Sequence, residues 1–101
     1  MSILHVPVVS FARFPVGRVV ITPGALALVE AGAFYPPALL ALHQRGDWGM
    51  VPREDAQANE DALRDGARIL SSYPVGDRPG KVWIITEADR SSTCILLPEE
   101  G

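Results

Sequence analysis

The order of apolar and polar residues in the last third of the chain predicts three consecutive antiparallel strands. Trp83 alternates with Val82 and Ile84, and this is the strongest strand pattern in the chain. The alternation predicts that Trp83 is a core residue on one face of a sheet. The three strands are expected at residues 68–73, 81–87 and 92–97.

The central part of the chain carries three short segments typical of helices, each bounded by residues that start or stop a helix. Thr22 can cap the first helix, and Pro23 suits the first helical position because its missing N–H would have no partner there. Glycine follows each segment as a C-terminal stop, at Gly32, Gly46 and Gly66. The helices are expected near residues 23–31, 37–45 and 53–64.

The third of these helices is strongly polar, so we expect it to lie on the outside of the protein. Glu54 and Asp55 near its start suit the positive end of the helix dipole. Its narrow inner face is expected to consist of Ala56, Asn59, Ala62 and Leu63.

Helices followed by strands indicate an α+β domain rather than a parallel α/β sheet. Residues 15–22, rich in β-branched side chains, add a short N-terminal strand ahead of the helices. The predicted fold is therefore a short N-terminal strand, two to three short helices and a three-stranded antiparallel β-meander. Residues 14–101 form a single domain. Residues 1–13, interrupted by Pro7, are interpreted as an N-terminal extension whose removal costs little stability.

Composition narrows the class of protein. Hydrophobic residues make up 48% of the 101 residues, which excludes disorder of the whole chain. The net charge of −3 argues against nucleic-acid binding, because proteins that bind nucleic acids neutralise the phosphates with basic residues. No apolar stretch has the length of a membrane span, and the N-terminus lacks the pattern of a signal peptide. We therefore expect a cytoplasmic protein.

Side chains able to support chemistry are few and scattered. Cys94 is the single cysteine, which excludes an intrachain disulfide and a cysteine-based zinc site. His43 and Asp47 are four residues apart, but Gly46 is expected to end the helix between them. The acidic residues of the third helix lack metal-ligand spacing and are interpreted as a solvated face. We expect no catalytic residue, no metal and no cofactor.

Two segments are candidates for an interface with another protein. One is the loop Gly46-Asp47-Trp48-Gly49, in which Asp47 and Trp48 stand between glycines. Trp48 either packs into the core or anchors a partner, and we favour inward packing because an exposed indole forgoes burial energy. The other is the tip of the last hairpin, with Glu87, Asp89 and Arg90, where ordinary turn chemistry is the competing interpretation.

Several short motifs, spread over about residues 14–100, carry a resemblance to known proteins. They are Thr22-Pro23-Gly24-Ala25, Gly46-Asp47-Trp48-Gly49, Glu54-Asp55, Asn59-Glu60, Gly66, residues 68–73, residues 82–91 and residues 96–100. On these motifs the sequence resembles a group of small bacterial proteins labelled "plasmid-related protein", some members of which carry the label of a type I restriction enzyme fragment. The resemblance implies a mobile-element setting and a bacterial cytoplasm, and no catalytic residues.

The leading functional hypothesis is a non-catalytic accessory protein that binds another protein or itself, with a defence-modulating role as one version. The alternative is a small toxin-like ribonuclease that uses basic, imidazole and carboxylate groups without a metal. That alternative requires its candidate side chains to meet in one cleft, and the acidic balance counts against it. A DNA-binding regulator is weaker still, since no basic recognition helix is visible. The ribonuclease candidates are His43, Arg45, Lys81, Glu87 and Arg90.

Overall fold

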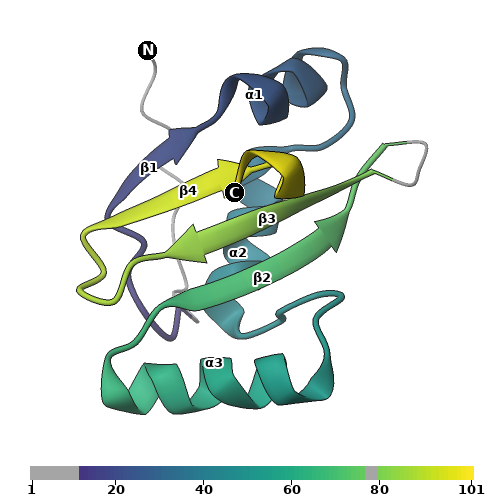
Figure 1. The fold of residues 1–101 in the computed structure, drawn as a ribbon. Helices are drawn as coiled ribbons and strands as arrows, with labels where there is room; N and C mark the ends of the chain where they lie inside the picture. Colours follow the sequence, from purple (N-terminus) through teal and green to yellow (C-terminus); the bar gives the residue numbers. More distant parts are fainter. Residues whose placement is uncertain (1–11, 77–79) are drawn as a thin grey trace.

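The computed structural model describes residues 12–76 and 80–101, which form an α+β domain with three α-helices and one four-stranded sheet (Figure 1). The helix that follows the last strand is a single 3₁₀ turn. In chain order the elements are β1 (Arg18–Ile21), α1 (Pro23–Glu30), α2 (Pro36–Arg45), α3 (Arg53–Asp65), β2 (Ile69–Pro74), β3 (Lys81–Thr86), β4 (Ser92–Leu96) and η1 (Pro98–Glu100).

The sheet is mixed, with the strand order β1-β4-β3-β2. β2, β3 and β4 pair antiparallel, as their alternation and turns predicted. The predicted fold is wrong in one respect, because β1 does not stand apart from the meander. It pairs parallel to β4, with Arg18 opposite Ser92 and Ile21 opposite Ile95, and makes a fourth strand. Periodicity identifies a strand but does not specify its neighbour, which here lies more than 70 residues away along the chain.

The three helices begin and end close to the predicted residues. Thr22 caps α1, where its side chain accepts a hydrogen bond from the Ala25 N–H at 3.3 Å. Gly46 and Gly66 end α2 and α3 in the left-handed conformation, with φ of 88° and 76°. α2 begins at Pro36, one residue before the predicted start.

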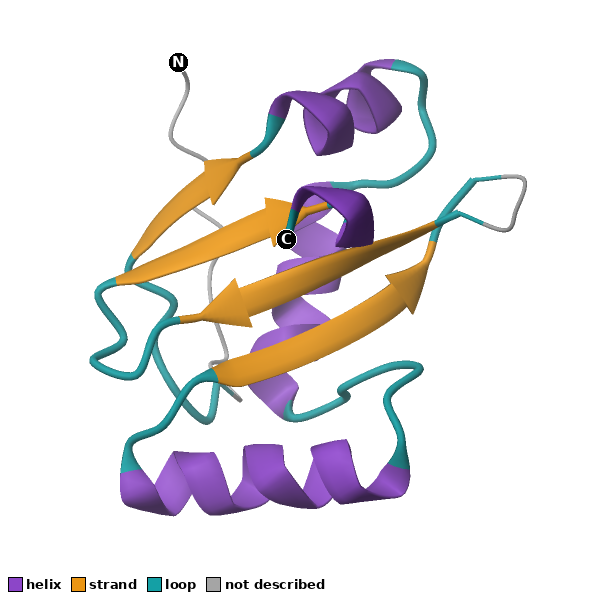
Figure 2. Ribbon diagram, viewed as in Figure 1, coloured by secondary structure: helices purple, strands orange, loops and turns teal. Residues whose placement is uncertain are grey.

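The helices cover the sheet unevenly. α2 crosses behind the sheet, whereas α3 runs along the edge formed by β2 and α1 lies beyond the end of β1 (Figure 2). Among the described elements, only η1 lies on the front of the sheet, near one end of β3 and β4. We call the side toward α2 the helix face and the opposite side the outer face.

Two apolar clusters form the interior behind the sheet. The larger cluster places Val82, Ile84 and Ile95 against partly buried leucines of α2, including Leu39 and Leu42. The smaller cluster lies at the α3 end of the molecule and consists of Phe14, Trp48, Ala62 and Ile69, with partly buried neighbours around them.

The free edge of β2 is closed by polar contacts. Asn59 of α3 accepts a hydrogen bond from the Leu70 N–H at 3.0 Å and donates one to the Leu70 carbonyl at 2.7 Å, as a neighbouring strand would. The backbone of Ser72 also bonds to the loop before α3: its N–H donates to the Trp48 carbonyl, and its carbonyl accepts from the Met50 N–H. The inner face predicted for α3 is therefore correct, and Asn59 in it protects a sheet edge from pairing with another chain.

The start of the described chain is attached to the helices. The Arg13 N–H donates to the Gln44 carbonyl at 2.7 Å, and its guanidinium makes two bonds to Glu60, at 2.8 and 3.0 Å. Most of the predicted N-terminal extension, residues 1–11, lies outside the described residues.

Candidate functional site

A chain of hydrogen bonds between buried polar side chains lies between α2 and the helix face of the sheet. His43 Nδ1 is 2.5 Å from Ser71 Oγ, and His43 Nε2 is 2.8 Å from Thr86 Oγ1. Thr86 Oγ1 lies 2.7 Å from Thr93 Oγ1, which donates to the carbonyl of Val16 at 2.7 Å. His43, Ser71, Thr86 and Thr93 are each 0% exposed.

The direction of each bond follows from the last one. Because Thr93 gives its hydrogen to the Val16 carbonyl, it must accept from Thr86. Thr86 must then accept from the Nε2–H of His43, which leaves Nδ1 to accept from the Ser71 hydroxyl. When His43 is the neutral Nε2–H tautomer, every side-chain hydrogen in this series of hydrogen bonds has an acceptor.

The electrostatic surroundings of His43 favour the same neutral form. Burial, together with the nearby positive charge of Arg90, lowers the pKa of His43 to about 4. A serine beside a histidine is the arrangement of a nucleophile and its base. Here both groups are sealed from solvent, so a substrate cannot reach them. We interpret the chain as structural: it satisfies polar groups in the core and sets the register of α2 on the sheet.

The loop that holds Asp47 and Trp48 turns inward. Trp48 is 6% exposed, stacks on Phe14 with ring centroids 6.1 Å apart, and donates from Nε1 to Glu60 at 3.1 Å. The inward packing favoured by the sequence is confirmed. Asp47 is exposed, and its carbonyl accepts a hydrogen bond from the Tyr73 hydroxyl at 2.5 Å. The indole therefore offers a partner little surface.

The hairpin tip mostly bonds to the protein itself. The Asp89 carboxylate accepts a hydrogen bond from the Ser91 N–H at 2.9 Å, and hydrogen bonds with Ser91 lower the pKa of Asp89. Arg90 has a positive φ of 61° and reaches back to α3, where it donates to the Ala62 carbonyl at 2.9 Å. It also donates to the carbonyls of Ala67 and Glu87. Arg90 thus satisfies one carbonyl near the C-terminal end of α3 and two carbonyls outside that helix.

The ribonuclease candidates are not brought together. His43 is sealed in the core, and Arg90 is bonded to backbone carbonyls. Lys81 begins β3 while Glu87 follows its end, so their Cα atoms are about 20 Å apart along the strand. Glu87 and Lys81 line two different hollows, and His43, Arg45 and Arg90 line neither of them.

In the described ranges 12–76 and 80–101, no three histidine, cysteine or acidic side chains are grouped so that they could hold a metal ion. Within the same ranges, no helix is both long and apolar enough to cross a lipid bilayer.

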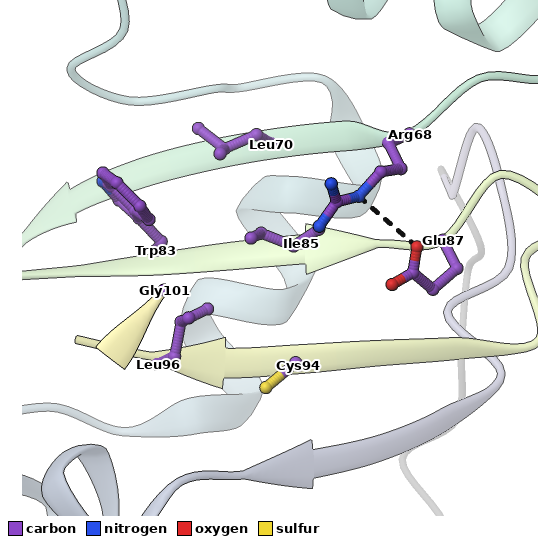
Figure 3. A pocket seen from close by; sticks show the side chains of 8 residues that line it. All are labelled: Arg68, Leu70, Trp83, Ile85, Glu87, Cys94, Leu96 and Gly101. Atoms are coloured by element: carbon purple, nitrogen blue, oxygen red, sulfur yellow. Dashed lines mark ion pairs between the residues drawn. The ribbon is translucent and has the colours of Figure 1, made fainter. Parts of the chain in front are cut away.

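The outer face of the sheet has a composition that the sequence interpretation overlooked. Trp83 was expected to be a core residue, but it lies on the face opposite to Val82 and Ile84 and is only partly buried. Ile85 shares this face, and Leu70 and Cys94 are its partners on the neighbouring strands. Figure 3 shows these side chains on one side of the strands, around a hollow of about 470 Å³.

The two ends of this hollow differ. Arg68 and Glu87 close one end with an ion pair of 3.4 Å between Nε and Oε2 (Figure 3). Leu96 and Gly101 lie with Trp83 at the other end, where η1 begins to cover the sheet. The lining is apolar apart from the ion pair and the thiol of Cys94, whose pKa is raised by burial and by the negative charges of Glu100 and Glu87.

One sequence signal could have revealed this surface. Residues 82–85 of β3 are all apolar, which is typical of a strand buried on both faces rather than on one. The described chain supplies helices for only one face. Such a strand therefore indicates either a second covering layer or a surface that another molecule covers.

No family model matches this chain, and neither a curated protein nor a solved structure is significantly similar to it.

Proposed function

We propose that this protein is a non-catalytic accessory protein that acts by binding another polypeptide through the outer face of its sheet. The carrying observation is the apolar hollow of about 470 Å³ around Trp83 and Ile85, which no described α-helix covers and which the η1 turn meets at one end only. Contiguous apolar surface of this kind on a small domain marks an interaction site, because its exposure to water is unfavourable.

The rest of the molecule supports an interaction role over catalysis. The His–Ser pair is sealed, the hairpin arginine is bonded to carbonyls, and the groups of the ribonuclease alternative do not share a cleft. The proposal therefore moves the expected interface from Trp48 to the outer face. Glu87 is the one earlier interface candidate that lines the hollow.

The setting of this interaction rests on resemblance. The resemblance to plasmid-related proteins implies a mobile-element setting, and our proposal for that setting is a small binding protein that modulates a host defence system. This part of the proposal concerns the identity of the partner and does not depend on the geometry of the sheet.

Site-specific photo-crosslinking in the producing cell tests the binding surface. Trp83 is replaced by p-benzoyl-phenylalanine, and exposed Gln57 on α3 receives the same replacement as a matched control. We expect a defined adduct from position 83 and none from position 57. The captured polypeptide, once purified, should bind the wild-type protein and lose binding to the Ile85→Arg variant. Absence of adducts from position 83 would refute the proposed surface.

A further inference from the structure

The η1 turn and the residue that follows it, together residues 98–101, lie across one end of the outer face (Figure 2). We propose that residues 98–101 form a detachable strap, which the carboxylate of Glu100 clamps to the start of α1, and that this strap controls how much of the outer face a partner can reach. The inference rests on the proposed function, because it concerns the regulation of the same binding surface.

Burial on the outer face shows what the strap covers. Leu96 pairs with Trp83 on this face and is only 6% exposed, although no described α-helix packs on this side of the sheet. Gly101 lies beside both residues (Figure 3), and a Cβ atom placed on it would be 3.1 Å from Trp83 Cζ3 and 3.4 Å from Leu96 Cδ1. Val20, on the same face but outside the strap, is 41% exposed.

One carboxylate holds the strap to α1. Glu100 Oε1 accepts hydrogen bonds from the Thr22 hydroxyl at 2.6 Å and from the Leu97 N–H at 2.9 Å. Glu100 Oε2 accepts from the Gly24 N–H at 3.1 Å. Thr22 and Gly24 form the start of α1, where free N–H groups and the helix dipole favour a negative charge. The bonds from Thr22 and Leu97 lower the pKa of Glu100, so the clamp is ionised at neutral pH.

The clamp also requires the absence of a side chain at position 24. A Cβ atom there would lie 2.7 Å from Leu97 Cδ1 and 2.8 Å from Glu100 Oε2, closer than such atoms approach one another in folded proteins. Gly24 is part of α1, and glycine is a less favourable helical residue than alanine. The helix therefore contains an unfavourable residue at the point where the carboxylate approaches its backbone.

The contacts of the strap are those of a segment that can detach. η1 contains no buried residue, and Glu100 is exposed, so water competes for each of its hydrogen bonds. Gly101 brings no side chain to Trp83, so little apolar area joins the strap to the sheet. Leu97, in contrast, packs against the larger apolar cluster on the helix face. Detachment would therefore move residues 98–101 and leave β4 in place.

Opening of the strap would enlarge the apolar surface. It would uncover Leu96 and the part of Trp83 that lies under Gly101, next to Ile85 in the hollow. The closed strap thus hides apolar area from water when no partner is bound. A partner that needs the whole face binds the open form, and its apparent affinity is lowered in proportion to the fraction of protein that is open.

Acrylamide quenching of tryptophan fluorescence in the full chain at pH 7 tests the strap. Trp48 is 6% exposed, so the quenchable emission comes mainly from Trp83, and the Trp83→Phe variant measures the remainder. Glu100→Ala removes the clamp, and Glu99→Ala removes the neighbouring exposed carboxylate of η1 as a matched control. We expect the quenching constant of Trp83 to rise by about twofold or more in Glu100→Ala and to stay unchanged in Glu99→Ala. An unchanged constant in Glu100→Ala overturns the proposal.

A second variant acts on the clamp from α1. Gly24→Ala places a methyl group in the space of the Glu100 carboxylate, although Gly24 does not line the hollow. Quenching of Trp83 should rise as it does in Glu100→Ala, while circular dichroism shows an intact fold. The double variant should be quenched no more than either single variant, because both changes open the same clamp. Additive increases would contradict the clamp.

Binding separates this inference from the proposed function. The polypeptide captured at position 83 should bind Glu100→Ala several-fold more tightly than it binds wild type or Glu99→Ala. Equal affinity for all three proteins refutes regulation by the strap, while the proposed surface stands. Increased quenching in Glu100→Ala without any photo-adduct from position 83 supports a detachable strap and refutes the proposed function.

Discussion

The two faces of the sheet differ in how their side chains are buried. The helix face is closed by α2 and carries both aliphatic residues and a complete chain of polar bonds through His43, Thr86 and Thr93. The outer face is apolar, and the described chain covers only one end of it. On the helix face, the buried side chains of His43, Thr86 and Thr93 all have hydrogen-bond partners, whereas Trp83 and Ile85 on the outer face stay partly accessible. We therefore expect the stability of the fold to depend on the first face, and we propose that binding of another polypeptide depends on the second.

The two tryptophans give the sharpest test of this difference. Trp48→Ala removes a buried indole that stacks on Phe14 and bonds to Glu60, so the free energy of unfolding should fall by about 3–5 kcal/mol. Trp83→Ala on the outer face should cost the monomer less than half as much, because that indole keeps part of its exposure.

Urea unfolding of both variants measures the two costs. The Trp83 variant should lose binding to the polypeptide captured at position 83, and the Trp48 variant should keep it while it remains folded. Equal costs in the monomer would mean that the outer face is covered within one chain, and the comparison between faces would fail.

Acid should act on the helix face through His43. The fold holds the pKa of His43 near 4, below the value of about 6.5 for an unfolded histidine. The unfolded chain therefore binds more protons between these values, and stability falls as pH decreases from about 6.5 toward 4. From pH 6.5 to 5 the loss should reach roughly 2 kcal/mol.

The matched variant for this prediction is His43→Gln, whose amide can donate and accept in the same core. The difference between wild type and variant in urea unfolding at pH 7, 6 and 5 isolates the histidine from other titrating groups. If the two proteins lose stability in parallel, His43 is already protonated in the fold or is not buried, and the assignment of the bond chain is wrong.

The smallest expected effect concerns a buried hydroxyl group of β2 that lacks a hydrogen-bond partner within the part of the chain that the structure describes. Ser72, which pairs with Trp83, is 3% exposed, and its hydroxyl has no hydrogen-bond partner among the described residues. Ser72→Ala should therefore be neutral or raise the free energy of unfolding by up to about 1 kcal/mol. Ser71→Ala should do the opposite, because Ser71 bonds to His43. Destabilisation of similar size in both would show that the Ser72 hydroxyl has a partner.

Local chemistry in the sequence determined the elements of this protein. Thr22 with Pro23, and the glycines at positions 46 and 66, act within a few residues of the helix ends that they define. The alternation in β3 and the turn at Asp89 are equally local: the alternation correctly predicted a strand, although not the side of the sheet that is covered, and Asp89 bonds within its own turn. The large apolar area of the Trp48 indole also sufficed to favour inward packing.

Tertiary structure alone decided what those elements do together. The parallel pairing of β1 with β4 and the bond chain from Ser71 to Val16 join residues far apart in sequence, where no short-range pattern specifies a partner. The side of the sheet that α2 covers was equally undetermined, because β3 is apolar on both faces. Placing α2 against Val82 and Ile84 left Trp83 and Ile85 accessible, and that choice created the candidate interface.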